Sequence, residues 1–372
     1  MTTGTNTLQF RRKNEVPSNK KVTYGRIVAS IRPQKQETHR TRLTVCGNLL
    51  DYHGDTSTPT TDLTTTKIHI NSVISTPNAK FAITDIGNFY LNNLLPESEC
   101  MKLLISIILN EIIQQYNLHD IVSDRWVYLE ILKGMYGLKQ AGKIAHDELV
   151  KHLAPYGYKP ARHTPGYWKH GNKPIAFVLC VDDFGIKYTK YTNKQDLDHL
   201  QQALKEKYNI KEDLTGNLYC GISLKWDYNK RTIKLFIPNY VKCALHKFQH
   251  SPLTRKQQVP HPWIPNVFGK QTQFVHEPLP SPPLSKHSTT RIQQIVGTVL
   301  YYARAINDII LVEFNSISTM QSKPILDTLR KVNHLLDYLA TNLDYEVTYK
   351  SSNMILHVDS DAAYLVAPGA KS

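Results

Sequence analysis

The stretch "FVLCVDDFGIKY", residues 177–188, decides the fold of this chain. Apolar, β-prone residues lead up to two adjacent carboxylates, Asp182 and Asp183, and resume directly after them. The pattern predicts a strand, a tight turn and a second strand, with both acids at or near the tip. Aspartate favours turns through local hydrogen bonds, so a solvated hairpin tip is one interpretation. A pair of metal-binding carboxylates is the other, and the rest of the chain has to decide.

A second acidic stretch is "KFAITDIGNFYLNN", residues 80–93, which predicts a strand that carries Asp85 near its end. Adjacent strands of one sheet can bring Asp85 to the Asp182–Asp183 pair. Three converging carboxylates repel one another and require cations, and hard oxygen ligands select Mg²⁺ or Mn²⁺. Two such ions clamp the attacking and leaving oxygens of an in-line phosphoryl displacement, which is the chemistry of nucleotidyl transfer.

The charge of the chain favours a polyanionic partner. Among 372 residues, 45 are Lys or Arg and 31 are Asp or Glu, which gives a formal net charge of +14. Nucleic acid or an anionic membrane surface would suit such an excess. The longest strongly apolar run, residues 103–109, is far shorter than the ~20 residues of a membrane-spanning helix. We therefore expect no membrane partner.

The cysteines and the N-terminus indicate an intracellular protein. Five cysteines are dispersed along the chain without a C-x-x-C pair, which argues against a disulfide framework and a zinc site. The N-terminal residues "MTTGTNTLQFRRKNE" contain no apolar core of a secretory signal. We expect a cytoplasmic or nuclear location.

The periodicity of apolar residues predicts a mixture of strands and helices. Strands are expected at 24–31 and 40–50, a loop at 52–63, a strand hairpin within 218–236, and helices within 141–157, 196–208, 291–306 and 325–340. Residues 64–76 suit a strand by their β-branched content and a helix by the threonines in front. Eight prolines within 251–285 predict an irregular connector between a mixed α/β portion and a helical portion.

Seven motifs together resemble the reverse transcriptase of copia-type LTR retrotransposons. They are "RLTVCG", "DIGNFYLN", "KGMYGLKQAGKIA", "CVDDFGIKY", "LYCGISLKWDY", "GTVLYYARAI" and "LHVDSDAAY", in the family's order from about Lys20 to the C-terminus. The pairing of "YGLKQA" with "VDD" about forty residues later is the most specific of these signals. The resemblance implies an α+β right-hand polymerase with fingers, palm and thumb and an antiparallel palm sheet. A helical connection and an incomplete RNase H-like C-terminus would follow.

The resemblance also implies a catalytic metal site. Asp85 matches the family's first metal ligand, and Asp182 and Asp183 match its "VDD" pair. Asp85 and Asp182 would hold both catalytic Mg²⁺ (or Mn²⁺) ions, and Asp183 would support the site. The implied reaction is attack of a primer 3′-hydroxyl on a dNTP, directed by an RNA or DNA template.

Four further residues match substrate-binding positions of the family. Tyr90 matches the aromatic residue under the incoming sugar, where it would exclude a 2′-hydroxyl, although a buried strand aromatic is the alternative. Gln140 matches a polar contact to the nucleotide, or satisfies nearby backbone at a helix start. Arg40 and Arg42 are candidates to grip the triphosphate, and a solvated strand face is an equal interpretation.

The C-terminal stretch "MILHVDSDAAYLVAPGAKS" resembles the opening strand of the family's RNase H domain, and Asp361 matches that domain's first metal-binding acid. Only eleven residues follow, so we expect no RNase H activity. The predicted division is a flexible basic arm (1–20), fingers and palm (21–225), a thumb-like region with the Pro-rich connector (226–290), a helical connection (291–345) and a truncated RNase H-like start (346–372).

Two alternatives to an active polymerase stay open. The first is a degenerate, catalytically silent remnant that retains the fold and binds nucleic acid through its basic surface. Other domains of a retrotransposon polyprotein are possible partners of either form. The second alternative is an unrelated two-metal nuclease, for which His163 and His170 are available as bases, although neither has metal-ligand spacing.

Overall fold

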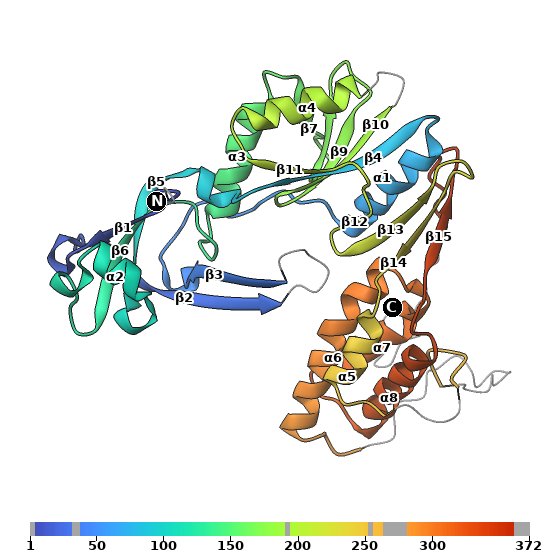
Figure 1. The fold of residues 1–372 in the computed structure, drawn as a ribbon. Helices are drawn as coiled ribbons and strands as arrows, with labels where there is room; N and C mark the ends of the chain where they lie inside the picture. Colours follow the sequence, from blue (N-terminus) through green and yellow to red (C-terminus); the bar gives the residue numbers. More distant parts are fainter. Residues whose placement is uncertain (1–3, 32–37, 190–193, 252–255, 263–280, 361–372) are drawn as a thin grey trace. The chain divides into compact units, whose positions relative to one another are not determined.

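The computed structural model describes residues 4–31, 38–189, 194–251, 256–262 and 281–360 (Figure 1). The chain divides into two compact units. Unit 1 comprises residues 1–66 and 78–215, and unit 2 comprises residues 67–77 and 216–372. Within the described ranges, no helix combines the length and apolar character that crossing a membrane requires.

The first sheet of unit 1 has five strands. In spatial order they are β1 (Leu8–Arg11), β6 (Trp126–Lys133), β5 (Leu94–Leu104), β2 (Val22–Ile31) and β3 (His39–Val45). Strand β1 corrects the prediction of a flexible arm over residues 1–20. It forms an antiparallel ladder with β6, and its Leu8 and Phe10 side chains pack against the core of this sheet. The alternation of apolar and polar residues in "LQFR" suits a half-buried strand.

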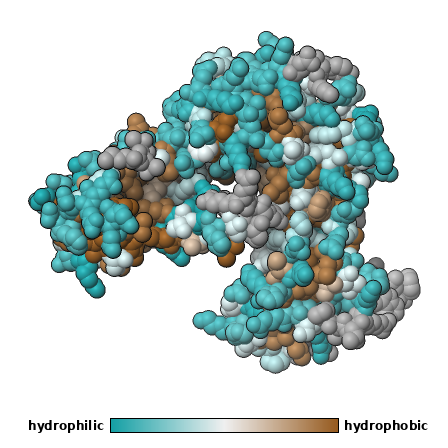
Figure 2. All heavy atoms as spheres, viewed as in Figure 1, coloured by the Kyte–Doolittle hydropathy of each residue, from teal (hydrophilic) through white to brown (hydrophobic). Residues whose placement is uncertain are grey.

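Strands β2 and β3 confirm the strands predicted at 24–31 and 40–50, although β3 ends at Val45 and a short 3-10 helix (Gly47–Leu49) follows. The two strands pair antiparallel, while β2 runs parallel to β5. The face shown in Figure 2 is mainly hydrophilic and carries several apolar areas, one of them on the part that holds this sheet. Large apolar side chains of β2 are exposed, among them Ile27 and Ile31.

The second sheet of unit 1 has six strands, and every neighbouring pair is antiparallel. In spatial order they are β11 (Ile210–Asp213), β4 (Ala79–Ile86), β10 (Asp183–Thr189), β9 (Ala176–Cys180), β8 (Tyr167–His170) and β7 (Tyr158–Pro160). The hairpin of β9 and β10 confirms the strand, turn and strand predicted at 177–188. Strand β4 confirms the strand predicted to carry Asp85.

Two amphipathic helices, α3 (Ala141–Leu153) and α4 (Gln195–Lys205), share a core cluster with one face of this sheet. Both confirm predicted helices. On the strands, the cluster takes alternate residues such as Ala82, Phe184 and Ile186. Because successive side chains of a strand point to opposite faces, Asp85 and Asp183 lie on the other face. The packing of the helices therefore leaves that face to the acids.

Helix α1 (Leu63–Ser75) settles the ambiguity at residues 64–76 in favour of a helix. Its start is capped by Asp62, whose carboxylate accepts a hydrogen bond from the backbone N–H of Thr65 at 2.6 Å. An aspartate in this position satisfies a donor that the first turn leaves unpaired. The predicted threonine cap is therefore replaced by an aspartate cap.

Unit 2 combines a small antiparallel sheet with helices. The strands, in spatial order, are β12 (Leu218–Tyr219), β13 (Ile222–Asp227), β14 (Thr232–Phe236) and β15 (Val347–Lys350). The helices are α5 (Tyr240–Lys247), α6 (Lys286–Ala305), α7 (Leu311–Met320) and α8 (Leu326–Thr341). The hairpin predicted within 218–236 and the helices predicted at 291–306 and 325–340 are confirmed. Unit 1 also contains the short helix α2 (Asn110–Gln115).

The strand expected at the RNase H-like start does not form in the described part. Residues 351–360 have no helix or strand, and the side chains of Ile355, Leu356 and Val358 are exposed. An apolar run becomes a strand only where a neighbouring strand pairs with it, and none of the described strands does so here. Asp361 lies outside the described residues.

Candidate active site

The pairing of β4 with β10 places two of the predicted acids opposite each other. Asp85 and Asp183 are Cα partners in the antiparallel ladder. The backbone N–H of Ile86 donates to the carbonyl of Asp182 at 3.1 Å, so Asp85 and Asp183 form the intervening non-hydrogen-bonded pair. In such pairs the Cα atoms lie about 4.5 Å apart and the side chains are close. The two carboxylates therefore face each other on one side of the sheet.

The turn between β9 and β10 presents the third acid. Cys180 and Asp183 are paired, so the turn consists of Val181 and Asp182 alone. Val181 has a φ of +62°. A positive φ at the first turn residue matches the twist of a two-residue hairpin but normally calls for glycine, and a β-branched residue there is strained. Strain of this kind clusters at functional sites, which favours a functional turn over a plain solvated tip.

Asp182 lies in an environment that disfavours its charge. Burial raises the pKa of its carboxyl group, and the nearby Asp85 carboxylate raises it further. The positive charges of Arg42 and Arg40 lower the pKa, without cancelling the first two effects. A carboxylate held in this way gains stability from a proton or a cation.

The two predicted arginines lie near this acid. Arg40 and Arg42 occupy alternate, half-buried positions of β3, so both side chains point from the same face of the strand. The guanidinium of Arg42 lies 4.5 Å from the ring centroid of Tyr136. The strand therefore brings two cations toward the carboxylates and gives one of them an aromatic support.

Tyr90 lies between the two sheets of unit 1. It is the first residue of a short 3-10 helix (Tyr90–Asn92) and packs against the core clusters of both sheets. Burial and the Asp182 charge raise the pKa of its hydroxyl. Gly134 leaves room for this arrangement, since a Cβ atom there would lie 2.7 Å from the carbonyl oxygen of Tyr90.

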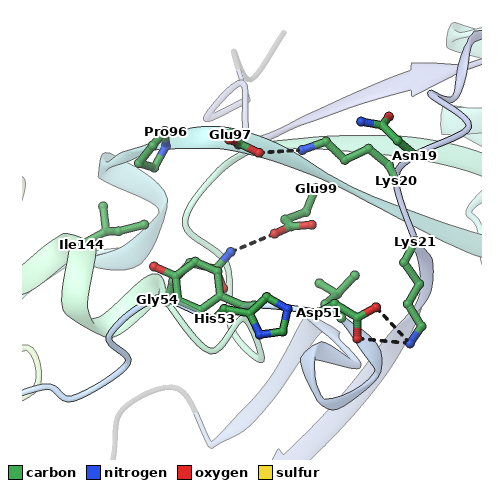
Figure 3. A pocket seen from close by; sticks show the side chains of 13 residues that line it. Asn19, Lys20, Lys21, Asp51, His53, Gly54, Pro96, Glu97, Glu99 and Ile144 are labelled. Atoms are coloured by element: carbon green, nitrogen blue, oxygen red, sulfur yellow. Dashed lines mark hydrogen bonds and ion pairs between the residues drawn. The ribbon is translucent and has the colours of Figure 1, made fainter.

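Gln140 lies in a different environment. Its side chain is 4% exposed, and its Nε2 atom donates to the Glu99 carboxylate at 3.0 Å. Both residues line a polar cavity of about 450 Å³, shown in Figure 3, together with Lys20 and Asp51. The lining includes none of the three site aspartates and neither site arginine.

Three residues around the acids were not predicted. Lys211 of β11 is the Cα partner of Asp85 on the strand edge away from Asp183, which gives that acid a neighbour of opposite charge. Tyr136 supports Arg42, and Val181 forms the strained turn. Tyr136 belongs to the "YGLKQA" motif, so the motif could have pointed to it. No sequence pattern points to Lys211, because β11 and β4 are far apart in the sequence and pair only in the folded chain.

The donor set suits a hard cation that is completed by other ligands. Among the residues that the structure describes, no group of three or more His, Cys, Asp or Glu side chains converges closely enough to form a metal cage. Mg²⁺ typically takes one or two protein carboxylates and completes its octahedron with water and substrate phosphates. The facing pair and the charge-disfavoured Asp182 fit that mode of binding.

Comparisons with known proteins show a sequence likeness to a retrotransposon polyprotein. No protein-family model matches the chain. Over 248 residues, or 63% of its length, the chain is 26% identical to the "Retrovirus-related Pol polyprotein from transposon RE1" of Arabidopsis thaliana. It spans 15% of the length of that polyprotein.

Two solved structures resemble the chain at a low level. A foamy viral protease-reverse transcriptase in complex with double-stranded DNA has a TM-score of 0.42 and 12% identity, over 91% of this chain and 45% of the other. The same type of protein with an RNA/DNA hybrid has a TM-score of 0.40 and 12% identity, over 88% and 34%. At this level neither likeness bears on function. The sequence relative confirms the resemblance seen in the motifs at a coarser level: this chain is similar to the Pol polyprotein of a retrotransposon.

Proposed function

We propose that this chain is the RNA-directed DNA polymerase of a copia-type retrotransposon. It would join dNTPs to the 3′-hydroxyl of a primer on an RNA or DNA template. The observation that carries the proposal is the register of β4 and β10, which sets Asp85 opposite Asp183 beside the Asp182 turn. The related Pol polyprotein supports the same conclusion.

In this proposal the sheets and helices of the two units correspond to the parts of a right-hand polymerase. The five-stranded sheet is the fingers, and the six-stranded antiparallel sheet is the palm. The hairpin of β13 and β14 with the helices of unit 2 provides the thumb and the connection. The stretch from β15 onward corresponds to the RNase H-like start.

Asp85 and Asp182 would hold two Mg²⁺ or Mn²⁺ ions, with Asp183 supporting them. When bound, such ions stabilise the negative charge that develops on the phosphate oxygens. The side chains of the protein would contribute the rest of the rate enhancement by positioning the reactants and by stabilising charge. The raised pKa of Asp182 supports this assignment, because binding a cation would relieve the unfavourable carboxylate charge.

The substrate contacts are proposed for four side chains. Arg40 and Arg42 would donate hydrogen bonds to the triphosphate, since guanidinium groups match phosphate oxygens in geometry and charge. Tyr90 would lie under the incoming sugar, where its half-buried ring would exclude a 2′-hydroxyl by steric contact. Gln140 has the weakest support of the four, because its amide is bound to Glu99 in a cavity whose lining contains none of the site aspartates or arginines.

The template and primer would bind through the basic surface. The formal net charge of +14 favours a polyanion, and the affinity would fall steeply with salt. A silent remnant would share this property, so nucleic-acid binding alone does not identify the polymerase. The nuclease interpretation is weaker, because Nδ1 of its candidate base His170 already accepts the backbone N–H groups of Asn172 and Lys173.

Primer extension tests the proposal. The purified chain is given an RNA template with an annealed DNA primer, dNTPs, and Mg²⁺ or Mn²⁺. The double variant Asp182→Asn/Asp183→Asn removes the acids of the turn. The matched control is Asp124→Asn, which neutralises an aspartate whose side chain is 83% exposed.

Extension by the parent and by Asp124→Asn, with none by the double variant, is the expected result. Absence of extension by the parent, together with salt-dependent template binding by all three proteins, would identify the silent remnant. Equal extension by the parent and the double variant would contradict the assignment of the acids. A DNA template in parallel separates RNA-directed from DNA-directed synthesis.

A further inference from the structure

The side chain of Arg42 lies against an aromatic ring. Its guanidinium lies over the Tyr136 ring at 4.5 Å, and its buried Nε atom has no hydrogen-bond partner among the described residues. The same guanidinium is close enough to Asp182 to influence that carboxylate electrostatically. An arginine near a half-buried carboxylate would otherwise gain by pairing with it directly. The ring therefore competes with the acid for the guanidinium.

Tyr136 is tied to the strand that carries Arg42. Its backbone carbonyl accepts a hydrogen bond from the N–H of Val45, the last residue of β3, at 2.8 Å. The next residue, Gly137, has a φ of +100°, and a Cβ atom there would lie 2.0 Å from the carbonyl oxygen of Val45. Only glycine permits this close approach. The backbone thus fixes the ring with respect to β3.

The Tyr136 ring also contacts the proposed sugar-selecting residue. The rings of Tyr136 and Tyr90 meet edge to face, with centroids 5.1 Å apart and an interplanar angle of 70°. This is a favourable geometry for two aromatic side chains. One ring therefore contacts both Arg42 and Tyr90.

We propose that Tyr136 is a positioning residue that keeps Arg42 available for the nucleotide triphosphate and braces Tyr90 beneath the sugar. This inference rests on the proposed polymerase function. A guanidinium stacked on a ring keeps the N–H groups of its edge free for bidentate contact with phosphate. Without the ring, Arg42 would pair with the carboxylates, which would block the phosphate contact and compete with the metal.

The test compares Tyr136→Leu with Tyr136→Phe, which keeps the aromatic face. Affinity for dNTP is measured at equilibrium in the presence of Ca²⁺, and steady-state extension gives kcat and KM. Tyr136→Leu is expected to weaken dNTP binding by about 10-fold, a value between those of an exposed and a fully desolvated cation–π contact, and to raise the Mg²⁺ concentration for half-maximal extension. Tyr136→Phe is expected to stay within about 2-fold of the parent.

Four further readouts separate positioning from plain structural damage. Primer–template affinity and the thermal midpoint should not change in Tyr136→Leu, whereas its preference for dNTP over rNTP should fall. In an Arg42→Ala background, Tyr136→Leu should cause little further loss of dNTP affinity, because the ring acts through the missing arginine. Full additivity of the two changes would overturn the inference.

The two proposals fail in distinguishable ways. An active parent with unchanged dNTP affinity in Tyr136→Leu refutes the role of Tyr136 alone. A combined loss of thermal stability and primer–template binding, not restored in Tyr136→Phe, also refutes it, since the tyrosine would then serve the fold. A parent that neither binds dNTP nor extends a primer refutes the proposed function, and this inference with it.

Discussion

Replacing Asp182 with asparagine is expected to stabilise the chain when divalent cations are absent. Burial and the neighbouring Asp85 raise the pKa of Asp182, so the fold disfavours the charged form. Asparagine keeps nearly the same shape and removes the charge. Neighbouring positions on paired strands lie ~5–8 Å apart, and two unit charges at ~6 Å in an effective dielectric of ~20 repel by roughly 3 kcal/mol.

The arginines offset part of this repulsion, which leaves an expected gain of ~1–2 kcal/mol in the free energy of unfolding near neutral pH. The sign of the pH dependence follows from the raised pKa. The folded chain holds this proton more tightly than the unfolded chain does, so the parent loses stability as the pH rises from the unfolded pKa through the folded one. The advantage of Asp182→Asn is therefore absent in acid and complete above the folded pKa of Asp182.

Urea unfolding in EDTA across this pH range measures the difference, and Asp124→Asn is the control for removing an exposed charge. Amide hydrogen exchange at Ile86, whose N–H donates to the Asp182 carbonyl, reports the effect locally. Added Mg²⁺ should then stabilise the parent more than Asp182→Asn. A variant that is less stable than the parent at neutral pH in EDTA would refute the electrostatic reasoning.

Three other substitutions test the packing and the remaining charges. Gly137→Ala should lower the free energy of unfolding, measured with urea, by ~2–4 kcal/mol, because the positive φ and the nearby Val45 backbone leave no room for a methyl group. Gly171→Ala is the control: a Cβ atom at Gly171 would meet nothing within 4 Å, so the free energy of unfolding should change little. Burial lowers the pKa of His146. The parent should therefore lose stability as the pH falls through ~6.5, the pKa of histidine in the unfolded chain. In thermal melts His146→Leu should abolish this loss, and an unchanged pH profile would contradict the role given to His146. Asp337→Ala should lower the free energy of unfolding in urea by ~3 kcal/mol, because the variant leaves the buried His250 side chain, 2.8 Å away and 9% exposed, without its partner. A change below ~0.5 kcal/mol would show that the pair does not stabilise unit 2.

Local sequence patterns determined much of the fold. Alternating apolar residues on both sides of Asp182 and Asp183 were enough to predict the hairpin of β9 and β10, because a strand's period of two depends on neighbours along the chain. The helices α3, α4, α6 and α8 were found in the same way, from apolar residues three and four positions apart. Each of these segments buries one face, so the spacing of its own apolar residues is enough to predict whether it is a strand or a helix.

The same patterns did not resolve segments whose structure depends on a distant partner. Strand β1 was predicted as a flexible arm, because its four residues are held by a ladder to β6 more than a hundred residues away. The apolar run at 354–358 had the composition of a strand but forms none, because none of the described strands pairs with it. Helix α1 was ambiguous until the cap at Asp62 was seen.

The site shows the same division. The sequence by itself named Asp85, Asp182 and Asp183 as acids near strand ends, together with Arg40, Arg42 and Tyr90 as candidate contacts. Only the tertiary structure decided that Asp85 faces Asp183, because the register of two strands is fixed by the packing of their buried faces and not by either strand alone. Only the tertiary structure placed the Tyr136 ring beneath Arg42, because that contact joins a strand and a loop about ninety residues apart through a glycine that lets their backbones meet.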